Sequence, residues 1–300
     1  MKPLKDKIAV VAGATRGAGR GIACMLGEVG ATVYCTGRSS RAKPTIRPAG
    51  DAPFELEGRP ETIEETAELV DRYGGVGIAV RVDHTVEADV ERLFERVSTE
   101  QGRLDILVND IWGGDALTEW GRPFWELSID KGLLMQQRAV HTHIITSRHA
   151  APLMVARRRG LIVEITDGDS PGYRGNLFYD LAKSSAIRLA YAMAEELRPH
   201  DIAALAVTPG FLRSEAMLEH FGVTEANWRD GAKRDPHFIA SETPFYVGRA
   251  IATLAADPNI AQKSGGAFSS WVLAEEYSFT DIDGRRPNWG KYYAEHVIGQ

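Results

Sequence analysis

The sequence has few cysteines, no long apolar run and nothing that resembles a signal peptide. Cys24 and Cys35, its only cysteines, fall in a predicted helix and a predicted strand, with no disulfide or metal-ligand spacing. No apolar segment is long enough to span a bilayer, and residues 1–13 lack the cleavage site of a signal peptide. We therefore expect a cytoplasmic protein with no membrane association.

Basic charge and metal-ligand clusters are also scarce. The formal net charge is -6, and no stripe of Lys and Arg is present to bind a phosphate backbone. The eight histidines are scattered, and His141 and His143 lie two apart on a predicted helix, so they point in different directions. We expect neither a nucleic-acid partner nor a metal.

The apolar residues, 44% of the chain, form short β-branched runs that alternate with segments of helical periodicity. This alternation predicts an α/β fold: a doubly wound parallel sheet of the Rossmann type, with helices on both faces and ligands outside the carboxyl ends of the strands. The predicted strands are KIAVVAG, ATVYCTG, VGIAVRVD, LDILVND, GLIVEIT, IAALAVTPG and GGAFSSWVLA.

No linker or internal repeat divides the chain, so residues 1–300 are predicted to be a single domain with a core over about 5–275. Residues 39–60 are rich in Pro, Gly and charge and are predicted to form a loop. Residues 214–242, which follow a predicted strand, are interpreted as a cap over a site. Residues 276–300 form a C-terminal extension.

A glycine-rich turn joins the first predicted strand to the first predicted helix. The segment AGATRGAGRGIA places Gly13, Gly17 and Gly19 where a tight turn lets backbone N–H groups approach a pyrophosphate.

A second motif lies in EITDGDSPGYRGNLFYDLAK, residues 164–183. Tyr179 and Lys183 are i and i+4 neighbours on a helix predicted from about 179 to 198. A nearby ammonium stabilises a phenolate, so we expect Lys183 to lower the pKa of Tyr179 and make it an acid or base near neutrality.

These motifs occur in an order that resembles the short-chain dehydrogenase/reductase family. The glycine turn is similar to T-G-x-x-x-G-x-G, with Ala12 for threonine, VNDIWGG stands in place of N-N-A-G, and Tyr179 with Lys183 fits Y-x-x-x-K. PGFLRSE resembles P-G-x-x-x-T, with Ser214 for threonine. In the tail, ADPNI and DIDGRRP resemble the dehydrogenase/reductase family member one subgroup.

The resemblance implies a nicotinamide cofactor and assigns its contacts residue by residue. Tyr179 would be the catalytic acid or base, Lys183 would also hold the nicotinamide ribose, and Asp83 would contact the adenine. The cofactor-binding residues implied are Gly13, Thr15, Arg16, Gly17, Gly19, Arg38, Asp83, Asn109, Tyr179, Lys183, Pro209, Gly210, Leu212 and Ser214.

The end of the second predicted strand indicates which cofactor is used. NAD enzymes place a carboxylate there for the ribose hydroxyls, whereas this sequence reads CTGRSSR, without an acid. Arg38 and Arg16 could form charge-assisted hydrogen bonds to a 2′-phosphate. The cofactor is therefore predicted to be NADP(H).

Two positions depart from the family pattern. The family's catalytic serine falls on Thr166 or Asp167, and the two ways of counting residues leave both open. Thr166 would keep a hydroxyl donor, whereas Asp167 could donate only if protonated. The family's helix asparagine falls near Ala139, whose side chain cannot form hydrogen bonds, although Gln136 or Gln137 could substitute.

The sequence thus predicts an NADPH-dependent oxidoreductase that transfers hydride between nicotinamide and a carbonyl or alcohol carbon. Aromatic residues after the strand ends suggest a small apolar or aromatic substrate. Alternatives are an NADP-binding sensor or scaffold without turnover and a reductase of C=N bonds. A homodimer or homotetramer is expected from the family. The aromatic residues are Trp112, Trp120, Phe124, Trp125, Tyr173, Phe178 and Phe211.

Overall fold

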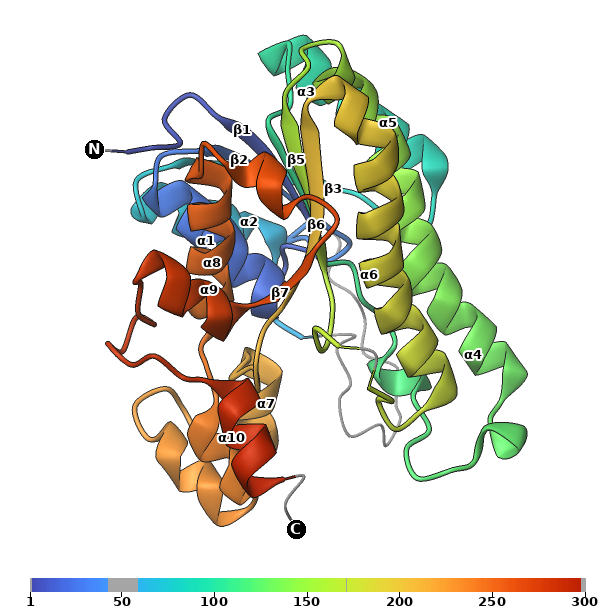
Figure 1. The fold of residues 1–300 in the computed structure, drawn as a ribbon, viewed down its shortest axis with the longest axis vertical. Helices are drawn as coiled ribbons and strands as arrows, with labels where there is room; N and C mark the ends of the chain where they lie inside the picture. Colours follow the sequence, from blue (N-terminus) through green and yellow to red (C-terminus); the bar gives the residue numbers. More distant parts are fainter. Residues whose placement is uncertain (1, 43–58, 171, 298–300) are drawn as a thin grey trace.

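A parallel sheet of seven strands, in the order β3-β2-β1-β4-β5-β6-β7, forms the centre of the protein (Figure 1). The structure is a computed structural model that describes residues 2–42, 59–170 and 172–297. It confirms the predicted doubly wound α/β fold; most of the predicted loop 39–60 lies outside the described residues. The strands are β1 (Ile8–Ala12), β2 (Thr32–Gly37), β3 (Val76–Arg81), β4 (Ile106–Asn109), β5 (Gly160–Ile165), β6 (Ile202–Thr208) and β7 (Ala267–Ser269).

Helices cover both faces of the sheet because the strands are apolar on both sides. Val11 of β1 packs in one core and Val10 in the other, as expected where neighbouring side chains point to opposite faces. The first core contains residues of α1 (Gly17–Glu28), α2 (Ile63–Arg72), α8 (Pro244–Ala256) and α9 (Ser270–Tyr277). The second contains residues of α3 (Glu87–Gln101), α5 (Thr142–Val155) and α6 (Leu177–Leu197).

The strand order changes direction between β1 and β4, which pair in parallel with Ala12 opposite Asn109. Chain connections leave these two strands toward opposite sides of the sheet, which opens a binding region at their carboxyl ends. The glycine turn follows β1 and VNDIWGG spans the end of β4, so the fold brings two of the sequence motifs together.

The helical segment that contains Ala139 is not uniform. It starts with α4 (Ile129–Gln136), where the Ser128 side chain accepts a hydrogen bond from the backbone of Lys131. A π-helical turn, Gln137–His141, then connects α4 to α5. Single π turns inside α-helices are frequent at functional sites. Here the turn contains Ala139, near which the family's asparagine is expected to fall.

The prediction that GGAFSSWVLA forms the last strand is wrong for the second half of this segment. Only Ala267–Ser269 is a strand, and Ser270–Tyr277 is helix α9. Trp271, Leu273 and Ala274 are all buried on this helix. A short apolar run of this kind does not distinguish a buried strand from a buried helix.

The predicted cap segment, residues 214–242, contains α7 (Glu215–Phe221) and two 3-10 helices, Trp228–Lys233 and Pro236–Ala240. The C-terminal helix α10 (Trp289–His296) lies beside it (Figure 1). The rings of Trp289 and Phe211 meet at 5.5 Å. Arg213, only 1% exposed, forms ion pairs with Glu225 of the cap segment and Asp283 of the extension. The extension is therefore tied to the cap segment.

Within the described ranges, no helix has the length and apolar character needed to cross a membrane. Cys24 and Cys35 are both buried and free.

Candidate active site

The turn between β1 and α1 requires glycine at two positions. A Cβ on Gly13, whose φ is 93°, would lie 2.3 Å from the carbonyl oxygen of Asp110. A Cβ on Gly19 would lie 2.3 Å from the carbonyl oxygen of Gly13. Gly17 begins α1 with φ 57°, and the N-cap residue Arg16 forms no side-chain cap bond. The turn therefore forms a cradle of backbone N–H groups suited to an anion.

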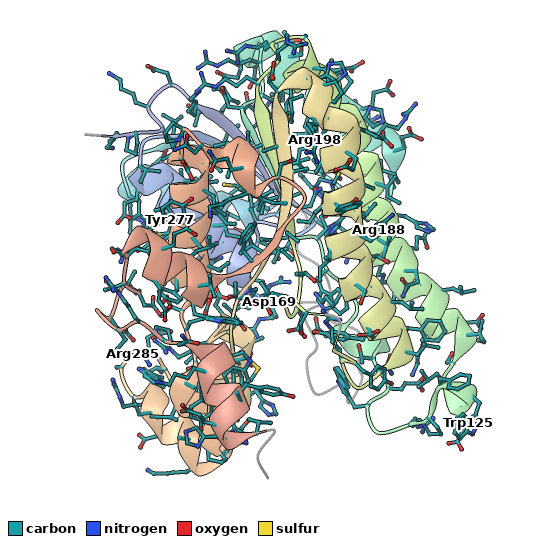
Figure 2. All side chains as sticks on the ribbon, viewed as in Figure 1. Trp125, Asp169, Arg188, Arg198, Tyr277 and Arg285 are labelled. Atoms are coloured by element: carbon teal, nitrogen blue, oxygen red, sulfur yellow. The ribbon has the colours of Figure 1, made fainter. Side chains whose placement is uncertain are left out.

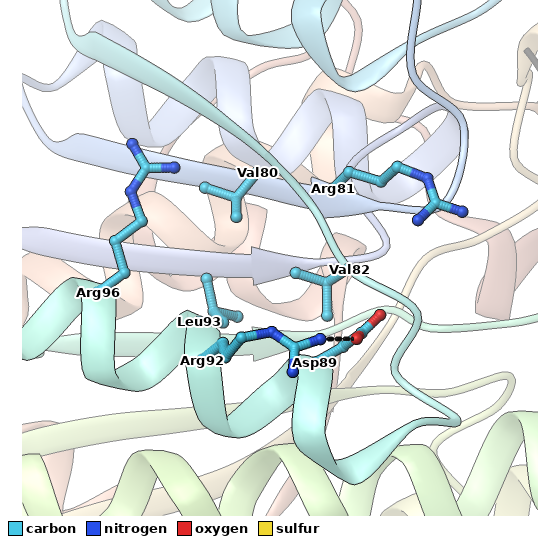
Figure 3. Close-up of a pocket in the computed structure, with 7 residues that line it drawn as sticks. All are labelled: Val80, Arg81, Val82, Asp89, Arg92, Leu93 and Arg96. Carbon is cyan, nitrogen blue, oxygen red and sulfur yellow. Dashed lines mark hydrogen bonds and ion pairs between the residues drawn. The ribbon is translucent and has the colours of Figure 1, made fainter. Parts of the chain in front are cut away.

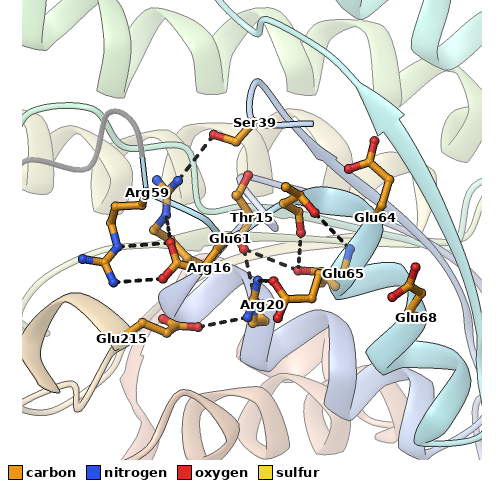
Figure 4. A network of polar contacts seen from close by, with 12 residues as sticks. Thr15, Arg16, Arg20, Ser39, Arg59, Glu61, Glu64, Glu65, Glu68 and Glu215 are labelled. Atoms are coloured by element: carbon orange, nitrogen blue, oxygen red, sulfur yellow. Dashed lines mark hydrogen bonds and ion pairs between the residues drawn. The ribbon is translucent and has the colours of Figure 1, made fainter. Parts of the chain in front are cut away.

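A carboxylate from the cap segment contacts this helix N-terminus. The backbone N–H of Gly17 donates to Oε2 of Glu215 over 2.8 Å, and Nη1 of Arg20 lies 3.6 Å from Oε1 of the same residue (Figure 4). Ser214 caps α7 by accepting a hydrogen bond from the backbone of Met217. The first residue of α7 is thus bonded to the first residue of α1.

Arg16 lies in a second charged group beside the turn (Figure 4). Its Nε is 3.4 Å from Oε2 of Glu61, and its Nη2 donates to the hydroxyl of Ser39 over 3.4 Å. Arg59 binds Glu61 through two hydrogen bonds of 2.9 and 3.1 Å. Burial lowers the pKa of Arg16, and the carboxylate of Glu61 opposes this effect. Neither Arg59 nor Glu61 was indicated by the sequence motifs.

Two further predicted cofactor residues follow β2 and β3. Arg38 is exposed, immediately after β2. Asp83 accepts hydrogen bonds from the backbone and the hydroxyl of Thr85, at 3.0 and 2.6 Å. Burial raises the pKa of Asp83, but the hydrogen bonds from Thr85 and the charge of Arg38 together keep it below its ordinary value.

Beneath the VNDIWGG segment lies a buried polar network. The amide of Asn109 donates to Glu164 over 2.7 Å and to Ser147 over 2.9 Å. The other carboxylate oxygen of Glu164 is 2.5 Å from Nδ1 of His143, whose Nε2 is 3.0 Å from the carbonyl oxygen of Ile111. Burial lowers the pKa of His143, but Glu164 more than compensates and raises it overall. An acceptor near each ring nitrogen favours the protonated form of His143, in the direction of its raised pKa.

Tyr179, Lys183, Thr166 and Asp167 lie where β5 ends and α6 begins. The Tyr179 hydroxyl donates to Oδ2 of Asp167 over 2.7 Å. The Thr166 hydroxyl instead donates to the backbone carbonyl of Lys183 over 2.7 Å, and Thr166 is only 3% exposed. Of the two candidates for the serine position, Asp167 contacts the tyrosine and Thr166 is turned toward the helix backbone.

The charges near the tyrosine shift its pKa in the direction opposite to the one expected. Burial and the carboxylate of Asp167 raise the pKa of Tyr179 well above 10. Burial also lowers the pKa of Lys183, an effect that Asp167, Asp110 and Asp115 oppose. The pKa of Tyr179 is therefore raised and not lowered as expected, because burial acts most strongly and the carboxylate of Asp167 adds to it.

Two of the predicted aromatic residues contact the tyrosine. The rings of Trp112 and Trp120 lie 5.4 and 5.1 Å from that of Tyr179. The Lys183 ammonium sits 3.9 Å from the ring centroid of Trp112. By contrast, Phe124 and Trp125 pair with each other and are exposed. Figure 2 shows Trp125 at the edge of the molecule.

Arg174 organises the segment between Asp167 and α6. Its guanidinium donates to the carbonyl oxygens of Asp167 and Ser170, and it forms an ion pair of 3.0 Å with Asp180. It also donates to the hydroxyl of Ser184 over 3.2 Å. The sequence analysis did not identify this residue, because its partners follow no spacing pattern.

The segment PGFLRSE crosses between the sheet and the cap segment. The backbone N–H of Gly210 donates to Oε2 of Glu242 over 2.9 Å, and Leu212 forms a parallel bridge with Glu242. Pro209 accepts a hydrogen bond from Thr208 over 2.8 Å. The backbone here is fixed by buried partners.

A recess of about 290 Å³ lies away from these residues, between the edge strand β3 and α3 (Figure 3). It contains none of the predicted site residues, and its Arg92 is paired with Asp89. We assign it no part in the site.

The geometry thus gathers the motif residues at the carboxyl ends of the strands, and the comparisons identify the family. A family model described as short chain dehydrogenase matches residues 49–222. The proteins named dehydrogenase/reductase SDR family member 1 of Mus musculus and Homo sapiens are 35% and 34% identical to this chain. Each alignment covers 94% of this chain and 85% of the relative. The chain belongs to the short-chain dehydrogenase/reductase family.

A solved structure of a short-chain dehydrogenase shares the fold. A crystal structure of a short chain dehydrogenase from Mycobacterium thermoresistibile superposes with a TM-score of 0.76 at 22% identity. The match covers 96% of this chain and 92% of that one. The protein is accordingly an NAD(P)-dependent oxidoreductase of the family, and the two mammalian relatives confirm the predicted subgroup.

Proposed function

We propose that the protein is an NADPH-dependent oxidoreductase that transfers hydride between nicotinamide and a carbonyl or alcohol carbon of a small apolar or aromatic substrate. The observation that carries this proposal is the convergence of the Tyr179 hydroxyl, the Asp167 carboxylate and the Lys183 ammonium beside Trp112. These groups include a proton donor and a cation, next to an aromatic surface.

The glycine turn fits a dinucleotide, since the close backbone packing at Gly13 and Gly19 makes a tight turn that presents the start of α1 to a diphosphate. When bound, the nicotinamide supplies or accepts the hydride. Lys183 would hold the nicotinamide ribose, and Asp83 would contact the adenine. In this proposal Leu212 and Ser214 bind the carboxamide, and the diphosphate competes with Glu215 for the N–H of Gly17.

Arg16 and Arg38 support the choice of NADPH, because no acid follows β2 among residues 38–42. Titration of NADPH and NADH into Arg38→Ala tests it. NADPH binding should weaken by about tenfold or more, whereas NADH binding should change little, since only NADPH loses a charge-assisted contact. Arg41→Ala is the control, because Arg41 is exposed and paired with Glu68. Equal losses for both cofactors would assign Arg38 a structural role.

Turnover distinguishes an enzyme from a cofactor-binding sensor. Purified protein should oxidise NADPH in the presence of at least one member of a panel of apolar and aromatic carbonyl compounds, and Lys183→Met should abolish this reaction. NADPH binding without product formation from any compound would favour the sensor.

We also propose a cytoplasmic homodimer or homotetramer. Both cysteines are free and buried, as is usual in a reducing compartment. Ile144 of α5 and Leu181 and Tyr191 of α6 are large apolar residues that are between 43 and 47% exposed. Light scattering should report a dimer or tetramer, and Leu181→Glu should weaken the association of the subunits. A monomeric wild-type protein would contradict the proposed assembly.

A further inference from the structure

The ammonium of Lys183 lies against an indole ring. Its Nζ is 3.9 Å from the centroid of the Trp112 ring and 5.5 Å from that of Tyr179. A cation over the face of a tryptophan is attracted by the negative charge of that face, and the attraction is strongest where water is excluded. The Trp112 contact therefore contributes to where the ammonium sits relative to the tyrosine.

The indole of Trp112 is itself fixed on three sides. Its N–H group, which can only donate, is hydrogen-bonded to the carboxyl group of Asp115. A Cβ on Gly114 would lie 2.5 Å from Cζ2 of the indole, so the ring packs directly against the backbone of that glycine. The ring also meets the ring of Tyr179 edge-on, with centroids 5.4 Å apart and an interplanar angle of 87°. These contacts select one orientation of the indole.

Resting on the proposed function, we propose that Trp112 is a positioning residue of the active site, which holds the Lys183 ammonium beside Tyr179, and that Asp115 and Gly114 orient its ring. An ammonium has three N–H donors. A ring face attracts the positive charge as a whole, so donors stay available for the nicotinamide ribose, the contact that the proposed function gives to Lys183.

Substitution of the indole tests this role. At saturating NADPH, the single-turnover rate with a carbonyl substrate should fall by at least about tenfold in Trp112→Leu, because the lysine loses the ring that holds it. Trp125→Leu is the matched control, since Trp125 is an exposed tryptophan at the surface, and it should keep the wild-type rate. A wild-type rate in Trp112→Leu would overturn the inference.

Asp115 variants distinguish orientation of the ring from a direct charge effect on the lysine. Asp115→Ala removes the acceptor of the indole N–H and should lower the rate by about fivefold. Asp115→Asn keeps an acceptor without the charge and should stay within about twofold of the wild type. In the Trp112→Leu background, Asp115→Ala should cause no further loss. Additive losses would show that Asp115 does not act through Trp112.

NMR gives a readout independent of turnover. Signals of a methylene group beside a ring face are shifted upfield by the ring current, so protein labelled with carbon-13 at lysine should show an upfield Cε–Hε signal that Lys183→Met removes. Trp112→Leu should return this signal toward the ordinary lysine position. Gly114→Ala should also move it, because the new Cβ displaces the indole, while a φ of -103° at this position accepts alanine.

The two readouts separate this inference from the proposed function. An unshifted Lys183 signal in the wild type would contradict the contact with Trp112. A wild type with the shifted signal that oxidises NADPH with no carbonyl compound would refute the proposed function and support the placement of the lysine by Trp112.

Discussion

The hydroxyl of Tyr179 donates a hydrogen bond of 2.7 Å to the carboxylate of Asp167. A tyrosine held in this way is a weaker acid than a free one, because ionisation would set a phenolate against a carboxylate. The relationship links the family's Y-x-x-x-K motif to one of the two candidates for the family's serine position.

Replacing the carboxylate should release the tyrosine. In Asp167→Asn the pKa of Tyr179 should fall toward the ordinary value near 10, since the repulsion of the phenolate is removed while its burial remains. NMR of protein labelled with carbon-13 at tyrosine Cζ measures this, with Tyr179→Phe identifying the signal. A pKa that stays the same in Asp167→Asn would show that burial alone raises it.

Thr166 is expected to matter for stability more than for turnover. Thr166→Val removes the hydrogen bond to the carbonyl oxygen of Lys183, which should lower the free energy of unfolding by about 1 kcal/mol. Turnover should change by less than about threefold, because this hydroxyl is directed to the backbone. Thr166→Ser serves as the matched control and should recover the stability. A large loss of turnover in Thr166→Val without loss of stability would instead make Thr166 the donor.

Arg174 should control substrate binding through the segment that it holds. Arg174→Lys keeps a charge but cannot reach several carbonyl oxygens at once. We expect KM for the substrate to rise about tenfold with NADPH affinity unchanged, as steady-state kinetics and cofactor titration can show. Arg188→Lys, an exposed change on α6, is the control. An unchanged KM in Arg174→Lys would remove the segment from substrate binding.

Glu242 should make stability depend on pH. Burial raises the pKa of Glu242 from 4.5 to about 8. The folded state therefore holds this proton more tightly, so the stabilisation is complete below pH 4.5 and is lost as the pH rises through about 8. Glu242→Gln keeps an acceptor for Gly210 and should flatten the profile by at least about 1 kcal/mol over this range.

Denaturant unfolding of the Glu242→Gln variant at several pH values measures the effect. Glu275→Gln, which changes an exposed carboxylate, should keep the wild-type profile. Parallel pH profiles for wild type and Glu242→Gln would mean that Glu242 does not titrate as described.

Much of the architecture could be predicted because each strand is a short apolar run bounded by turn residues. Counting residues could not decide whether Thr166 or Asp167 takes the place of the family's serine. Neighbouring residues of a strand point to opposite faces, so a shift of one position changes which side chain faces the site. Glu164 and Thr166, two apart, both bond to groups on α5 or α6.

Other parts of the site depend on contacts between distant segments. The pairs Gly17–Glu215 and Arg16–Glu61 join residues that no motif relates. The pKa of Tyr179 required knowing that a carboxylate, and not only Lys183, lies beside it. Such relationships arise from tertiary packing and carry no local signal in the sequence.

The most direct test of the proposed oxidoreductase is single-turnover oxidation of bound NADPH by a carbonyl substrate in the wild type and Tyr179→Phe. Tyr179→Phe removes only the hydroxyl that donates a hydrogen bond to Asp167. NADPH affinity should be unchanged and the rate should fall by about a hundredfold or more, the scale of a positioned general acid. A wild-type rate in Tyr179→Phe, with NADPH bound as tightly, would contradict the account.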